Sequence, residues 1–138
     1  MRLAGLCTGI GVVGGAIAAA CGGWDELMVA LCFCMLADFV MGILVAIRGK
    51  SKKTKSGALN STVGLKGICK KVAMLLIVVA TYRIGIAAGI PFVRDAVIFA
   101  FIANEAISLL ENGGLLGVIK PSALTQAIDI LKSKSDDK

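Results

Sequence analysis

Two apolar stretches, each about long enough to cross a bilayer, flank a segment that carries only positive charge. This segment covers residues 48–71 and contains eight basic and no acidic side chains: Arg48, Lys50, Lys52, Lys53, Lys55, Lys66, Lys70 and Lys71. In membrane proteins, Lys and Arg of short loops stay on the cytoplasmic side. The segment therefore predicts a cytoplasmic loop that sets the orientation of the chain and contacts anionic lipid headgroups. Its second half, from Leu59 to Lys71, could instead form an interfacial helix with its lysines toward the headgroups.

The composition also favours a membrane protein. Of the 138 residues, 57% are hydrophobic and only 17% are charged, whereas soluble domains carry roughly 25% charged residues. The chain has no histidine, so the usual general base and the commonest metal ligand are missing. The five cysteines form no C-x-x-C pair, and four lie inside apolar stretches, where Cys packs as a small apolar residue. We therefore expect no enzyme, no metal and no cofactor.

Four apolar segments are candidate transmembrane helices: residues 3–23, 27–47, 72–93 and 96–110. A span needs about 20 apolar residues, and the fourth segment is shorter and contains Glu105, so its insertion is marginal. The prediction is an all-α membrane protein with a bundle of three to four transmembrane helices in residues 1–117. After Asn112-Gly-Gly114 breaks the chain, residues 118–138 form a short amphipathic helix and a polar tail, with apolar residues at helical spacing from Leu124 to Leu131.

The distribution of charge predicts the orientation. If all four segments cross with a cytoplasmic N-terminus, 13 of the 15 basic residues lie inside, Arg83 lies in the membrane and only Arg94 lies outside. The positive-inside rule therefore favours cytoplasmic N- and C-termini. If the fourth segment does not cross, the tail ends outside. The first segment also stays open, because Ala18-Ala-Ala-Cys21 loosely resembles a lipoprotein cleavage site after a signal peptide.

Two opposite charges are expected inside the membrane. Asp38 and Arg83 each lie about twelve residues into neighbouring, oppositely running segments, so they should sit at similar depth. Two interpretations are open. They form a salt bridge inside the bundle, or they line a polar interface or water-filled path that opens when protomers rearrange.

The fourth segment has one polar side. Asn104, Ser108 and Glu111 recur at helical spacing, and so do Glu105, Ser108 and Asn112. Because a polar stripe on a membrane helix must face protein or water, we expect it to face other subunits or a lumen.

Small residues recur at four-residue spacing in two segments, as the glycine pairs Gly5/Gly9, Gly11/Gly15 and Gly85/Gly89. This spacing lets helix backbones approach closely in lipid, so the pairs are candidate helix-packing positions.

Three stretches of the chain resemble the phage-lysis and toxin-secretion holins of Gram-positive bacteria and their phages. They are Met35-Leu-Ala-Asp-Phe-Val-Met-Gly42, Gly64-Leu-Lys-Gly-Ile-Cys-Lys-Lys71, and the segment from Asp95 to Asn112 with its Ile-Ala-Asn-Glu and Ser-x-x-Glu-Asn pieces. The similarity covers about residues 27–132, with Met41 standing where a small polar residue is expected. It implies a small protein that oligomerises in the cytoplasmic membrane and permeabilises it, releasing an endolysin or a toxin.

Three other functions compete with this one. A small ion- or proton-coupled transporter could use Asp38 and Glu105 as its acids, although the chain shows no clear internal repeat. A membrane anchor or accessory subunit could use the basic loop to bind anionic lipid or a soluble partner. Nucleic-acid binding is disfavoured, because one Tyr and one Trp offer no stacking platform.

Overall fold

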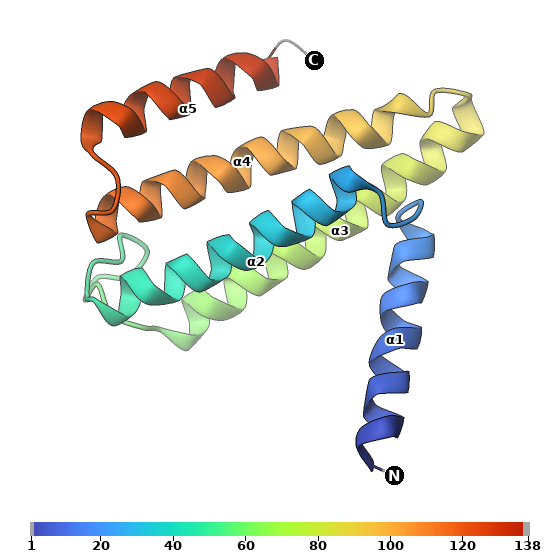
Figure 1. Ribbon diagram of the computed structural model, residues 1–138, viewed down its shortest axis with the longest axis horizontal. Coiled ribbons are helices and arrows are strands. Elements are labelled where there is room, and N and C mark those ends of the chain that lie inside the picture. Colours follow the sequence, from blue (N-terminus) through green and yellow to red (C-terminus); the bar gives the residue numbers. More distant parts are fainter. Residues whose placement is uncertain (1, 137–138) are drawn as a thin grey trace.

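The computed structural model describes residues 2–136, which fold into five α-helices (Figure 1). The helices are α1 (Arg2–Ala20), α2 (Glu26–Ile47), α3 (Ser61–Ala88), α4 (Phe92–Leu116) and α5 (Pro121–Asp136). The predicted all-helical class is confirmed. Residues 137 and 138 of the expected polar tail lie outside the described residues.

Helix α4 is the centre of the molecule, since it contacts α2, α3 and α5. Helices α2 and α3 both pack against α4, and α2, α3 and α4 run in alternating directions, whereas α1 leads away from the bundle (Figure 1). The core is formed by buried apolar side chains of the α1–α2 turn and of α2, α3 and α4: Cys21, Met28, Leu31, Met35, Met74, Val78 and Ile98.

The helix ends follow from local chemistry. Asp25 caps α2 by accepting a hydrogen bond from the Met28 backbone N–H at 2.9 Å, and Asn60 caps α3 in the same way through Thr62 at 2.9 Å. Helices α3 and α4 end at Gly89 and Gly117, whose φ angles of 71° and 79° lie in the left-handed region that favours glycine.

Helix α3 corrects the predicted basic loop. The helix begins at Ser61 rather than at residue 72, so only the first half of segment 48–71 is a loop. Val63, Gly67 and Lys71 are partly buried and Met74 is buried. These residues recur every three or four positions, so they share the face of the helix that points into the bundle. The exposed Lys66 and Lys70 lie on its outer side.

Helix α4 is also longer than expected, at 25 residues, or roughly 37 Å at 1.5 Å per residue. The predicted break at Asn112-Gly-Gly114 is wrong. A Cβ atom on Gly113 or Gly114 would lie 2.8 Å from the side chain of Ile119 or Leu124, respectively. These glycines therefore continue the helix and let α5 and the turn before it pack closely, while the predicted apolar row from Leu124 to Leu131 is half-buried.

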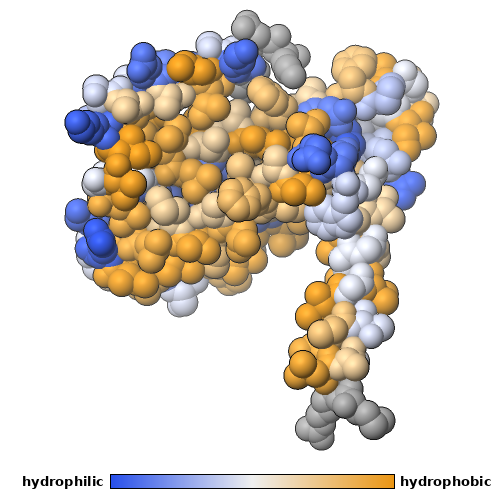
Figure 2. Space-filling model, viewed as in Figure 1, coloured by the Kyte–Doolittle hydropathy of each residue, from blue (hydrophilic) through white to orange (hydrophobic). Residues whose placement is uncertain are grey.

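Two of the described helices are long and apolar enough to cross a membrane, through residues Leu3–Ala20 and Glu26–Ile47. Apolar side chains cover much of the bundle face seen in Figure 2, and hydrophilic ones lie mainly along its edges. An exposed apolar surface of this kind suits contact with lipid. Crossing of the membrane by α3 and α4 stays a prediction.

Candidate functional site: a buried ion-pair cluster

One lysine joins the three helices of the bundle. Lys71 of α3 pairs with Asp38 of α2, with 2.9 Å between Nζ and Oδ2, and also pairs with Glu105 of α4. The Glu105 side chain is fully buried, and those of Lys71 and Asp38 are only 14% and 12% exposed. Each helix therefore contributes one charged group to a shared interior site.

Neighbouring groups complete the cluster. Lys70 Nζ lies 3.5 Å from Glu105 Oε1, and the amides of Asn112 and Asn104 donate to Asp38 at 3.3 Å and to Glu105 at 3.4 Å. Two lysines thus balance two carboxylates.

The cluster lies about halfway along the bundle. Counted from the loop end, Asp38 is nine residues from the end of α2, Lys71 is ten residues into α3, and Glu105 is eleven residues from the end of α4. These counts correspond to roughly 14–17 Å of helix, which is about half of the ~30 Å hydrocarbon core of a bilayer.

The expected partner of Asp38 was Arg83, and this pairing is wrong. The Arg83 side chain is exposed and lies 6.0 Å from the centre of the Tyr82 ring. The depth estimate failed because α3 begins eleven residues earlier than predicted. Arg83 lies twelve residues beyond Lys71, which is roughly 18 Å further along α3 and about 120° around it.

The polar stripe on α4 divides into two parts. Glu105 and Asn112 are buried and Ser108 is partly buried, so this row faces the interior and Asp38. Asn104 and Glu111 are exposed on the outer edge. The spacing predicted a polar stripe that faces other subunits or a lumen. In the structure, Asn112 donates to Asp38 of α2 and Glu105 pairs with Lys71 of α3, so this row faces neighbouring helices of the same chain. Contact of the stripe with other subunits or a lumen stays a prediction.

The predicted lipid-contact residues also divide. Lys71 lies in the cluster and pairs with two carboxylates, so its ammonium group is not available to a lipid headgroup in this arrangement. The other seven basic residues of segment 48–71 are exposed: Arg48, Lys50, Lys52, Lys53, Lys55, Lys66 and Lys70. Sequence reasoning missed the role of Lys71, although Met74 and Val78, three and seven residues on, mark the same buried face.

The glycine pairs do not form helix contacts within this chain. No neighbouring atom would lie within 4 Å of a Cβ on the glycines of the two α1 pairs, which are Gly5, Gly9, Gly11 and Gly15. In α3, Gly89 ends the helix, and a Cβ on Gly85 would lie 3.0 Å from the Ile90 carbonyl oxygen. The second pair therefore shapes the α3–α4 turn, and helix packing by the α1 pairs stays a prediction about contacts between copies.

A second ion-pair site lies at the opposite end of the bundle. Arg94, which was expected to lie outside the membrane, is buried in the first turn of α4 and donates to the Cys21 carbonyl at 2.6 Å. It also pairs with Asp25 at 2.5 Å and Asp95 at 2.9 Å. The hydrogen bond from the Arg94 guanidinium lowers the pKa of the Asp25 carboxyl below its usual range. Arg94 thus fastens the α1–α2 turn to α4.

Among the described residues, no three His, Cys, Asp or Glu side chains are grouped closely enough to hold a metal ion. The two buried carboxylates are instead occupied by lysine. The arrangement can hold three helices together and can present four charges if those helices separate.

Comparison with known proteins identifies the family of this chain. The model of the bacteriophage holin family matches residues 15–133. The chain belongs to the bacteriophage holin family. The predicted family is confirmed, and the match includes the ion-pair cluster, the basic loop and most of α5.

Several relatives share most of the chain. An uncharacterised protein of Listeria innocua is 37% identical over 131 residues, which is 93% of this chain and 89% of the relative. An uncharacterised 14.9 kDa protein from the nagH 3′ region of Clostridium perfringens is 34% identical over 116 residues, 82% of each chain. A probable holin of Bacillus phage phi105 is 29% identical over 100 residues, 72% of this chain and 74% of the relative. No solved structure matches.

Proposed function

We propose that this holin accumulates in the cytoplasmic membrane, associates with further copies and permeabilises the membrane, so that an endolysin or a toxin is released. Family membership supports the general function, and the probable phage holin among the relatives points the same way. The observation that carries the mechanism is the charged cluster in the middle of an apolar bundle.

In the resting bundle, the cluster joins α2, α3 and α4. Charges in a dry interior persist only when they are paired and hydrogen-bonded. If the helices separate as copies associate, Asp38, Lys71 and Glu105 require water instead of one another. The same residues would then line a water-filled path.

The proposed orientation places the 48–60 loop and both termini in the cytoplasm, with α1 to α4 crossing. The exposed lysines of this loop support it, because positive loops stay inside. At the other end, Arg94 is paired with Asp25 and Asp95, so little free positive charge faces outward. Arg83 then lies near the outer surface and not at the midplane.

The two alternative functions gain no support from the site. A proton- or cation-coupled transporter needs carboxylates that its substrate can reach, and Lys71 pairs with both Asp38 and Glu105. An anchor or accessory subunit needs no charged cluster inside its bundle.

Controlled expression in a Gram-positive host tests the proposal. The membrane potential is followed with a voltage-sensitive dye, and release of a co-expressed cytoplasmic endolysin is followed by loss of turbidity. We expect a delay, an abrupt loss of potential and then lysis, whereas an equally abundant multi-pass membrane protein should leave the potential intact. Full accumulation in the membrane with a lasting potential would contradict the proposal.

A further inference from the structure

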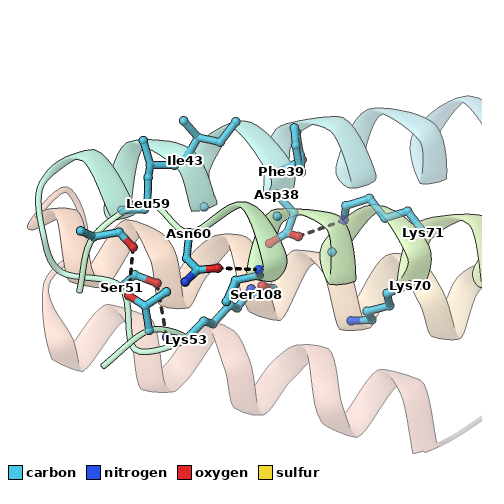
Figure 3. Close-up of a pocket in the computed structure, with 17 residues that line it drawn as sticks. Asp38, Phe39, Ile43, Ser51, Lys53, Leu59, Asn60, Lys70, Lys71 and Ser108 are labelled. Atoms are coloured by element: carbon cyan, nitrogen blue, oxygen red, sulfur yellow. Dashed lines mark hydrogen bonds and ion pairs between the residues drawn. The ribbon is translucent and has the colours of Figure 1, made fainter. Parts of the chain in front are cut away.

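A cavity of about 130 Å³ lies between the 48–60 loop and helices α2 and α3. Its apolar walls include Phe39 and Ile43 of α2, Val63 of α3, and Leu59. Figure 3 shows Phe39, Ile43 and Leu59 together with the Asp38–Lys71 ion pair, which also lines the cavity. One buried water needs only ~10–15 Å³, so the space is large enough for part of a bigger ligand.

The cavity exists because three glycines leave room between the helices. Gly42, Gly64 and Gly67 all line it, and a Cβ atom on any of them would meet nothing within 4 Å. A longer side chain at these positions could fill the space without displacing backbone. The cavity can therefore be closed experimentally without altering a charge.

The polar part of the lining has more positive than negative charge. Asp38 is already paired with Lys71, while Lys53 extends from the loop toward Ser108 (Figure 3). Among the described residues, no carboxylate lies within ion-pair distance of Lys53. Lys70 also lines the cavity, but it is paired with Glu105 at 3.5 Å, so Lys53 supplies the uncompensated positive charge. The lining thus combines apolar walls with an excess of positive charge.

We propose that this cavity binds one anionic phospholipid, with its phosphate at Lys53 and an acyl chain against Phe39, Ile43 and Val63. Charge complementarity selects an anionic headgroup. The apolar walls select a lipid over a free phosphate, because hydrocarbon loses contact with water there and an inorganic anion would gain no partner. The inference rests on the membrane location of the holin and not on lesion formation.

Lipid retention by the purified full chain tests the site. The protein is extracted in mild detergent, exposed to phosphatidylglycerol or phosphatidylcholine, and examined by native mass spectrometry. We expect one phosphatidylglycerol per chain and little phosphatidylcholine. Lys53→Gln should weaken binding by about fivefold, the effect of roughly one lysine at an anionic surface, and Gly67→Leu should abolish it by filling the cavity.

Lys55→Gln is the matched control, because Lys55 belongs to the same loop and does not line the cavity. It should retain lipid like the parent chain. Helical circular dichroism shows whether Gly67→Leu is folded, and Lys53→Gln tests the site independently. Equal retention of phosphatidylglycerol by the parent chain and all variants would overturn the proposal. Thermal stabilisation by inorganic phosphate alone that equals the stabilisation by phosphatidylglycerol would also overturn it. Lysis plays no part in this readout, so failure here is distinguishable from failure of the proposed function.

Discussion

Lys71 is the residue whose ion pairs connect the three central helices. Its side chain pairs with one carboxylate from α2 and one from α4, and Lys70 supplies the second positive charge at Glu105. Such a cluster contributes less to stability than its number of ion pairs indicates, because each charge loses its hydration on burial. Removing one member is nevertheless costly, since its partners stay buried without compensation.

Replacement of Lys71 by methionine should therefore destabilise the bundle. Lys71→Met leaves Asp38 without its lysine and Glu105 with only Lys70, and we expect a loss of about 3–5 kcal/mol. Thermal unfolding in detergent, followed by helical circular dichroism, measures this loss. Arg83→Met is the control, because Arg83 is exposed and has no carboxylate partner among the described residues. A larger effect at Arg83 than at Lys71 would show that the pairing is wrong.

The Arg94–Asp25 pair predicts a dependence of stability on pH. Because the hydrogen bond from Arg94 lowers the pKa of Asp25 in the folded state, its contribution is complete above the unfolded value of about 3.9. It is lost as the pH falls through the lower folded value. Asp25→Asn removes the charge and keeps a side chain that can cap α2.

Melting temperatures of the parent chain and of Asp25→Asn in detergent should therefore differ most above about pH 5, begin to approach each other below about pH 4, and converge only below the lowered folded pKa of Asp25. The corresponding difference in the free energy of unfolding should be small, at most about 1 kcal/mol, because the Asp25 side chain is 48% exposed. A difference that grows with acidification would contradict the pairing.

At the scale of elements, the prediction was good for helix type and poor for helix ends. The second segment matches α2, because its apolar run ends at the first charges of the loop. The start of α3 was missed because residues 59–71 were expected to form a loop or a separate interfacial helix, whereas they continue directly into the third segment. Charge alone also does not show which of the lysines faces inward. The end of α4 was missed because Gly113 and Gly114 normally disfavour a helix, and only the packing of α5 explains them.

The early start of α3 makes a prediction about its glycines. Gly64 lies inside the helix with open space around it, so Gly64→Ala should stabilise the chain by roughly 0.5–1 kcal/mol. Gly89→Ala should destabilise it by about 1–2 kcal/mol, because Gly89 has a φ angle of 71° at the end of the same helix. Chemical unfolding in detergent measures both. If Gly64→Ala were also destabilising, residues 61–71 would not be a helix.

At the scale of the whole molecule, the sequence predicts the family, the helical class and the existence of a polar stripe on α4, but not that part of this stripe faces α2 and α3 of the same chain. It does not predict the partners in the cluster, because they depend on the register between α2, α3 and α4. It also does not predict that α1 leads away from the bundle (Figure 1). Hydropathy and glycine spacing describe a helix suited to lipid and to close packing, but they do not show which chain it packs against.

The central claim is that the Asp38–Lys71–Glu105 cluster holds the resting bundle together and opens during permeabilisation. The most direct test is the delay between induction and loss of membrane potential in cells that express Asp38→Asn, Glu105→Gln or Glu111→Gln. Glu111 is the matched control, since it is an exposed acid on α4, the helix that also carries Glu105. With equal accumulation verified by immunoblotting, we predict a shorter delay for the first two variants and an unchanged delay for the third. Unchanged delays for both Asp38→Asn and Glu105→Gln would contradict the claim.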